Sequence, residues 1–285
     1  MVCVADFQSE LYSLITDSES KVVVVKGKWG VGKTYYWNSF VVKNKDDIFF
    51  DKYSYVSLFS ISSLEQLKIA MFENTKLFKS PSYELGFWSG FRSAGSFKNK
   101  YIFFRRYFST IVRPSFFRFF EFRQLKGFSS LAQMYALSKV KDMLICIDDL
   151  ERRSSNLSMK DILGLVSYLR ENKNCKIVIL YNDDADSDDS SYLTYKEKVI
   201  DYELEFSPNP EDNISLIIKS TCKTSIILKK YLSFFEVNNI RIISKIYKNL
   251  LPFFELLSDE ESHAIDMFIH RFVFFSLSYY KASQN

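Results

Sequence analysis

Short apolar runs alternate with longer amphipathic segments along the first part of the chain, and this alternation predicts strands followed by helices. The runs at 22–25 and 143–147 contain no charged residue, which is typical of strands buried on both faces of a parallel sheet. We expect strands at about 21–26, 52–60, 143–147, 175–181 and 202–206. We expect helices at 6–16, from the first loop to about 43, from 64 after a serine cap at 62 or 63, at 129–140, at about 159–172 and near 191–200. Strands that alternate with helices indicate an α/β fold with a parallel sheet.

The strand pattern stops at Glu211, and the remaining residues have the apolar spacing of four or five helices. We therefore expect a core at residues 1–207 and an all-helical lid at 208–285. An insertion at about 78–128 interrupts the core. The chain has 285 residues, of which 47% are hydrophobic, so the material for a sizeable core is present.

The first apolar run leads into Gly-Lys-Trp-Gly-Val-Gly-Lys-Thr at 27–34, which has the spacing of a phosphate-binding loop. In such a loop, backbone N–H groups point at the phosphates, the lysine reaches the terminal phosphates and the hydroxyl binds magnesium. Glycines are needed because a Cβ atom would block the backbone's approach and its positive φ angles. The expected nucleotide-binding residues are Gly27, Lys28, Trp29, Gly30, Val31, Gly32, Lys33, Thr34 and Tyr35. The alternative is a glycine turn that binds no ligand.

Two adjacent carboxylates follow the apolar run at 143–147 and supply the residue types that a nucleotide site still lacks. The run places Asp148 at the carboxyl end of a central strand, which is the edge where phosphates bind in α/β sheets. We expect Asp148 to bind magnesium together with Thr34. Asp149 is expected to polarise the attacking water, with Lys33 also acting on the phosphates. The alternative is an acidic pair that caps the next helix.

Three other polar residues are candidates for contact with the phosphates. Asn182 directly follows the strand at 176–181, where an amide can bind the terminal phosphate or the water, although asparagine also forms turns. Arg152 follows the acidic pair and is a candidate for stabilising charge at a neighbouring subunit, or for a local salt bridge. Arg241 begins a helical run in the lid and either reaches the phosphates or lies on the surface. The acidic residues at 183–189 are interpreted as a solvated loop, because they lack the glycine and glutamate of a calcium-binding hand.

The motifs together resemble the KAP family of P-loop NTPases, within the larger class that includes the AAA+ and STAND ATPases. The resemblance rests on the loop at 27–34 with its tryptophan, on Ile-Asp-Asp-Leu-Glu-Arg at 147–152 and on Asn-Ile-Arg at 239–241. It implies a three-layer fold, an ATPase that works as a molecular switch, and sometimes a role in anti-phage defence. It also implies that Arg241 acts as a lid sensor. Many KAP proteins carry transmembrane helices between the two nucleotide motifs, and this chain does not.

The insertion has its own character, since residues 87–126 are dense in phenylalanine, tyrosine, arginine and lysine. Basic residues interleaved with aromatic rings can stack on bases and contact phosphates of a nucleic acid. The same mixture can lie on an anionic membrane surface. The third interpretation is a helical insertion that packs its rings on the core or on a partner protein. Residues 92–126 are our expected interaction surface.

Charge and cysteine content narrow the class of protein. The formal net charge is +4, which does not by itself indicate a nucleic-acid partner. The four cysteines form no C-x-x-C pair and the chain has only two histidines, so we expect no zinc site. The same cysteine usage fits a protein of the reducing cytosol. No signal peptide and no apolar stretch long enough to cross a bilayer is seen. We expect a cytoplasmic protein, and the alternative is a location at the inner membrane surface.

The patterns favour a Mg²⁺-dependent ATPase that couples hydrolysis to a conformational change or to assembly. ATP is preferred over GTP because the chain has no Asn-Lys-x-Asp guanine motif. One alternative is a nucleotide-gated module that binds a protein or a membrane and turns over negligibly. Another is an ATPase stimulated by nucleic acid. The expected partners are ATP, and a further copy of the chain or a different protein.

Overall fold

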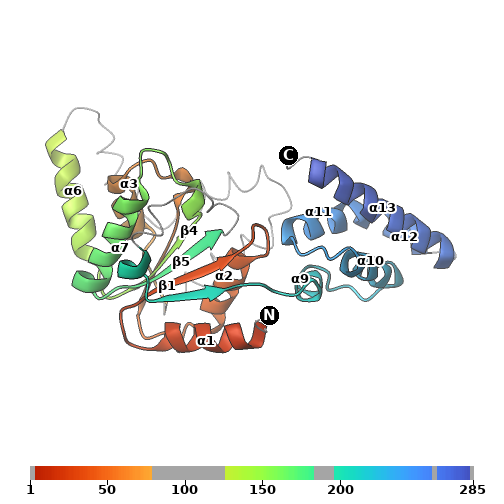
Figure 1. Cartoon of the computed structure of the whole chain (residues 1–285), viewed down its shortest axis with the longest axis horizontal. Helices are drawn as coiled ribbons and strands as arrows, with labels where there is room; N and C mark the ends of the chain where they lie inside the picture. The colour runs from red at the N-terminus through yellow and green to blue at the C-terminus, as the bar shows by residue number, and fades with distance from the viewer. Residues whose placement is uncertain (1–3, 79–125, 183–195, 259–261, 283–285) are drawn as a thin grey trace. The chain divides into compact units, whose positions relative to one another are not determined.

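The computed structural model describes residues 4–78, 126–182, 196–258 and 262–282. The chain divides into two compact units (Figure 1). The sheet unit comprises Glu10–Lys26 and Trp37–Leu204, and the helical unit comprises Met1–Ser9, Gly27–Tyr36 and Glu205–Asn285. The expected phosphate-binding loop therefore belongs to the same compact unit as the C-terminal helices. The insertion at 78–128 and the acidic loop at 183–189 fall almost entirely outside the described residues, and our interpretation of both stays a prediction.

Six strands form one mixed, mostly parallel sheet in the order β3-β2-β4-β5-β1-β6. They are β1 (Val22–Gly27), β2 (Lys52–Ser57), β3 (Lys76–Leu77), β4 (Leu144–Asp148), β5 (Lys176–Asn182) and β6 (Tyr202–Glu205). Strand β4 pairs in parallel with β2 on one side and β5 on the other, so that Ser57 lies opposite Asp148 and Ile147 opposite Ile179. The parallel α/β sheet expected from the sequence is confirmed, with a short antiparallel strand, β3, added at its edge.

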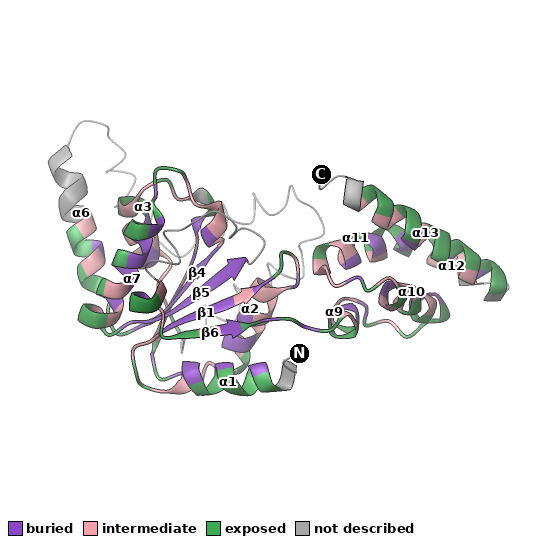
Figure 2. Ribbon diagram, viewed as in Figure 1, coloured by how far each residue is buried: buried purple, intermediate pink, exposed green. Residues whose placement is uncertain are grey.

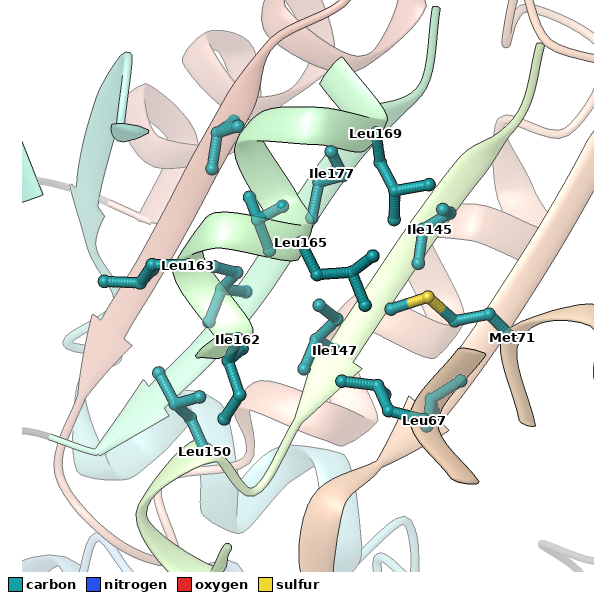
Figure 3. Packing of buried hydrophobic residues seen from close by; sticks show 14 of the residues in the cluster. Leu67, Met71, Ile145, Ile147, Leu150, Ile162, Leu163, Leu165, Leu169 and Ile177 are labelled. Carbon is teal, nitrogen blue, oxygen red and sulfur yellow. The ribbon is translucent and has the colours of Figure 1, made fainter. Parts of the chain in front are cut away.

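Helices α3 (Leu64–Glu73), α6 (Lys126–Lys139) and α7 (Met159–Lys173) lie against one face of the sheet. The apolar positions of α7 recur at helical spacing and are buried, as the sequence predicted. Figure 3 shows these side chains packed against β4 and against α3. The cluster includes Leu67, Met71, Ile145, Ile147, Ile162, Leu163, Leu165, Leu169 and Ile177. Every residue of β4 is buried (Figure 2); because alternate residues of a strand point to opposite faces, this means that both faces of the sheet are covered at β4.

The other face is covered by α1 (Val4–Thr16) and α2 (Lys33–Lys43), which Figure 1 shows on the opposite side of the strands from α7. Trp37 of α2 is almost fully buried, and its indole Nε1 donates a hydrogen bond to the hydroxyl of Tyr53 at 2.9 Å. Buried indole and phenol groups usually find such a partner. This bond ties α2 to β2.

Several element boundaries differ from the expectation. The strand expected at 52–60 ends at Ser57, because a 3₁₀ turn over Leu58–Ser60 follows and the Ser57 side chain accepts from the backbone N–H of Phe59. The cap of α3 agrees with the expectation of Ser62 or Ser63, since the Ser63 hydroxyl accepts from Gln66 N. Asn182 is the last residue of β5 and does not follow it.

The described elements after β6 are all helical, as expected: α9 (Pro210–Ile217), α10 (Lys223–Phe234), α11 (Ile240–Leu250), α12 (Phe254–Ser258) and α13 (Ser262–Ala282), with a 3₁₀ turn at Leu251–Phe253. They share a core of their own, in which Ile214, Leu232, Ile246 and Ile269 are buried. Among the described helices of the chain, none is both long enough and apolar enough to cross a bilayer.

A buried lysine joins β5 to the end of α1. The ammonium of Lys176 donates to the carbonyl oxygens of Leu14, Ile15 and Asp17 at 2.7–3.2 Å, and to the Asp17 carboxylate at 2.5 Å. The last carbonyl groups of a helix lack partners within the helix, and here the lysine supplies them. Burial opposes ionisation of Asp17, but hydrogen bonds from Lys176 and Lys21 outweigh it and lower the pKa of this carboxyl.

We predict that Asp17→Asn destabilises the fold by about 1–2 kcal/mol at neutral pH, because the Lys176 ammonium loses its counter-charge. A carboxyl whose folded pKa is depressed stabilises the fold above its unfolded pKa, here 3.8, and this contribution is lost as the pH falls through the folded value. The difference between variant and parent should therefore shrink below about pH 4. Urea unfolding at pH 7 and pH 3 measures it. Glu19→Gln, at an exposed ion pair with Lys21, is the control and should change little; a pH-independent difference for Asp17→Asn would contradict the prediction.

Candidate nucleotide-binding site

The loop at 27–34 has the backbone that its glycines imply. Gly30 and Gly32 have φ angles of +83° and +100°, which residues with a Cβ atom rarely adopt. The neighbourhood is also tight, since a Cβ on Gly27 would lie 2.4 Å from the carbonyl oxygen of Phe206. A side chain at Gly30 would meet Asn239 at 2.2 Å. The glycines are therefore required by conformation and by packing within the helical unit.

Lys33, Thr34 and Tyr35 form the first turn of α2, directly after the loop. The first N–H groups of a helix have no partner within it and carry a partial positive charge, which attracts anions. The Lys33 ammonium donates to the carbonyl oxygen of Lys28 at 3.0 Å and also to that of Gly27. Its charge is thus held against the loop. Lys28 and Trp29 are exposed, whereas Val31 is buried.

The start of α11 is hydrogen-bonded to this loop. The backbone N–H of Ile240 donates to the carbonyl of Gly30 at 2.8 Å. Asn239 caps α11 through its side-chain oxygen, which accepts from the N–H groups of Arg241 and Ile242. The Arg241 guanidinium lies over the Trp29 ring, with 5.2 Å from Cζ to the ring centroid. The sequence-predicted Arg241 and the loop therefore belong to one set of contacts.

Asn213 of α9 adds a second link that sequence reasoning missed. Its side chain is buried, and Nδ2 donates to the carbonyl oxygens of Val31 at 3.1 Å and Asn238 at 2.9 Å. The buried amide thus connects the loop to the segment that precedes α11. The asparagines at 238–239, before Ile240, could have predicted the start of α11, because asparagine is a frequent helix cap. No local feature of the sequence predicted the contact of Asn213 with the loop.

In the sheet unit, Asp148 ends β4 and is buried, with 6% of its surface exposed. Its Oδ2 accepts from the Tyr55 hydroxyl at 2.6 Å and its Oδ1 from the backbone N–H of Asp149 at 2.8 Å. The register brings Tyr55 opposite Cys146, two residues before Asp148 on the same face. Burial, followed by the negative charge of Asp148, raises the pKa of Tyr55 well above its usual value. The phenol therefore stays protonated and donates.

Asp149 has a left-handed backbone, with φ of 58°, a conformation that aspartate tolerates better than most residues. Its Oδ2 accepts from the Ser57 hydroxyl at 2.6 Å, and its Oδ1 lies 3.8 Å from Nε of Arg152. The Arg152 guanidinium lies over the exposed ring of Phe59, at 5.5 Å. Strand β2 and the turn after β4 thus hold the carboxylate on two sides. These contacts of Arg152 match the local salt bridge considered above.

Asn182 is buried at the end of β5, and its Nδ2 lies 3.4 Å from a carboxylate oxygen of Glu151. Strand β5 lies between β4 and β1 in the sheet.

The site residues predicted from the sequence fall into two sets, one in each compact unit. Lys33, Thr34 and Arg241 belong to the helical unit, and Asp148, Asp149, Arg152 and Asn182 belong to the sheet unit.

The oxygen donors suit magnesium. Mg²⁺ at nucleotide sites takes one or two protein ligands and completes its shell with phosphate oxygens and water. The carboxylate of Asp148 and the hydroxyl of Thr34 are ligands of this hard type. Within the described residues, His, Cys, Asp and Glu do not gather into groups of three or more able to enclose a metal by themselves. The donor chemistry thus fits a metal shared with a nucleotide.

Comparison with solved structures finds the same architecture elsewhere. The chain is similar to the ORC2 protein of Aeropyrum pernix in its ADPNP–ADP complexes, with a TM-score of 0.57 and 13% identity, over 96% of this chain and 66% of that one. The ADP form of the same protein matches with a TM-score of 0.53 and 15% identity, over 94% of this chain and 66% of that one. This chain thus spans slightly less than two thirds of the length of either structure.

No protein-family model matches the sequence, and no curated protein matches it significantly. At 13–15% identity the likeness concerns the fold. Together with the six-stranded, mostly parallel sheet and its flanking helices, it shows that the chain has the three-layer α/β fold of a P-loop NTPase.

Proposed function

We propose that this chain binds ATP with Mg²⁺ and hydrolyses it, and that hydrolysis drives a conformational switch. The observation that carries the proposal is the loop at 27–34, where glycines at positive φ lead into a helix whose first residue is the lysine held against that loop. This combination is how proteins bind the phosphates of a nucleotide. The P-loop NTPase fold supports it.

In this proposal Lys33 and the N–H groups of the loop bind the β- and γ-phosphates. Thr34 and Asp148 would hold the magnesium, which would supply positive charge to neutralise the phosphates. Asp148 already has a fixed orientation, because each of its oxygens accepts a hydrogen bond from a neighbour.

Asp149 is the proposed base. The oxygen of a water forms a bond to the γ-phosphorus, the bond from that phosphorus to the ADP oxygen breaks, and the water's proton passes to the Asp149 carboxylate. Asn182 is proposed to hydrogen-bond the water or the terminal phosphate. Its place at the end of β5, the strand beside β4 in the sheet, supports this role.

The switch is proposed to run through the links between the loop and the C-terminal helices. Ile240 N–H and Asn213 bind the loop carbonyls directly, so a change in the loop when phosphates bind is passed to α9 and α11. Arg241 is proposed as the sensor, moving between the Trp29 ring and the terminal phosphate. The KAP-like motifs support this reading and suggest a place in a prokaryotic defence or signalling complex.

A second function is favoured by the state of Asp149. Its Oδ2 accepts from Ser57 and its Oδ1 lies 3.8 Å from Nε of Arg152, so both oxygens already face neighbouring side chains. This supports a nucleotide-gated binding module that turns over slowly until another molecule frees the base. The two functions differ in whether the isolated chain releases phosphate.

We predict that Asp149→Asn lowers phosphate release from Mg-ATP about 100-fold or more, because a general base of this kind contributes at least that factor. Nucleotide binding should survive, since the loop and Lys33 are untouched. Phosphate release and the affinity for a fluorescent ATP analogue are measured on both proteins. Asp161→Asn, at an exposed position in the first turn of α7, is the matched control. Equal turnover in parent and Asp149→Asn would rule out Asp149 as the base.

We predict that Asn213→Ala weakens ATP binding about tenfold, because loss of the buried amide leaves the Val31 carbonyl unsatisfied at a cost of about 1–3 kcal/mol. Asn249→Ala removes an exposed asparagine of α11 in the same helical unit and should leave affinity unchanged. Equilibrium titration with a fluorescent ATP analogue compares them. Unchanged affinity in Asn213→Ala, with the fold intact by circular dichroism, would contradict the link between α9 and the loop.

A further inference from the structure

Tyr55 is a β2 residue whose hydroxyl is committed to one carboxylate. The hydroxyl donates a hydrogen bond of 2.6 Å to Oδ2 of Asp148, a residue 93 positions later in the sequence. Tyr53 lies two residues earlier on the same face of β2, and its hydroxyl accepts from Trp37 instead. The two phenols of one strand therefore have different partners, one in the core and one at the proposed metal ligand.

The backbone at Tyr55 is held from the other side. Asn74, the C-cap of α3, donates from its side-chain amide to the carbonyl oxygen of Tyr55 at 2.9 Å. On the opposite edge of β2, the parallel pairing with β4 sets Tyr55 against Cys146. The phenol therefore extends from a backbone that is fixed on both sides, and its hydroxyl reaches a fixed point beside Asp148.

We propose that Tyr55 is a positioning residue for the magnesium that binds with ATP, an inference that rests on the proposed function. Its hydroxyl holds Oδ2 while the N–H of Asp149 holds Oδ1, so the carboxylate plane of Asp148 cannot rotate. A ligand held in its binding orientation loses less conformational freedom when the metal arrives. Groups that orient a metal ligand in this way commonly change metal affinity 10–100-fold when removed.

The chemistry of the position argues for this role over simple packing. Phenylalanine fills nearly the same volume and has a similar preference for strands, so packing alone does not require a hydroxyl. The hydroxyl lies beside a buried carboxylate, where an oxygen left without a donor is costly. Tyr55→Phe therefore removes the orienting bond and leaves the ring in place.

The test compares Tyr55→Phe with Tyr53→Phe, because each removes one hydroxyl from β2 and one hydrogen bond from the sheet unit. Affinity for a fluorescent ATP analogue is titrated in EDTA and across a range of Mg²⁺ concentrations. We expect Tyr55→Phe to raise the Mg²⁺ concentration at half-maximal effect about tenfold, with the EDTA affinity unchanged. Tyr53→Phe should lower the melting temperature to a similar extent and leave the Mg²⁺ requirement as in the parent.

A double variant separates orientation from general loosening of the strand. If Tyr55 acts through Asp148, adding Tyr55→Phe to Asp148→Asn changes the Mg²⁺ requirement no further. If the parent binds the analogue with a clear Mg²⁺ dependence and Tyr55→Phe shows the same dependence, this inference alone is overturned. A parent whose binding is indifferent to Mg²⁺ would overturn the proposed magnesium site, and this inference with it.

Discussion

The parallel pairing of β4 with β2 and β5 is the constraint on which the acidic part of the site depends. Parallel strands end at the same edge of a sheet, and the register sets Ser57 opposite Asp148. Tyr55 and Ser57 then lie two residues apart on one face of β2, where they donate to Asp148 and Asp149 respectively. A shift of one residue in this pairing would turn both donors to the other face. Every residue of β4 is buried, including Asp148.

The fold was predictable because its signals are local. The valines at 22–25 and the run at 143–147 needed no partner information to be read as buried strands, and both are. The phosphate-binding loop was equally predictable, because the spacing of its glycines follows from the backbone conformation that the loop needs. Boundaries were less certain where two local preferences compete, as at Ser57, whose hydroxyl can end a strand by capping a turn. The edge strand β3 has two residues, too few to show a period.

The supporting residues of the candidate site could not be found in this way. Tyr55 reaches Asp148 across 93 residues, and Asn213 reaches Val31 across 182. Such contacts come from the order of the strands and from the packing of α9 and α11 near the loop within the helical unit. A tyrosine in a strand or an asparagine in a short helix has no local mark of that role. The sequence identified residues proposed to touch the nucleotide, and the structure adds those that orient them.

The central claim is that the loop at 27–34 binds the phosphates of ATP through Lys33. The most direct measurement is calorimetric titration of Mg-ATP into the purified chain and into Lys33→Ala. The account predicts saturable binding near one ATP per chain that is lost or strongly weakened in Lys33→Ala, since the lysine charge and the glycine backbone act on the same phosphates. Absence of binding in the parent, or equal affinity in the two proteins, would contradict it.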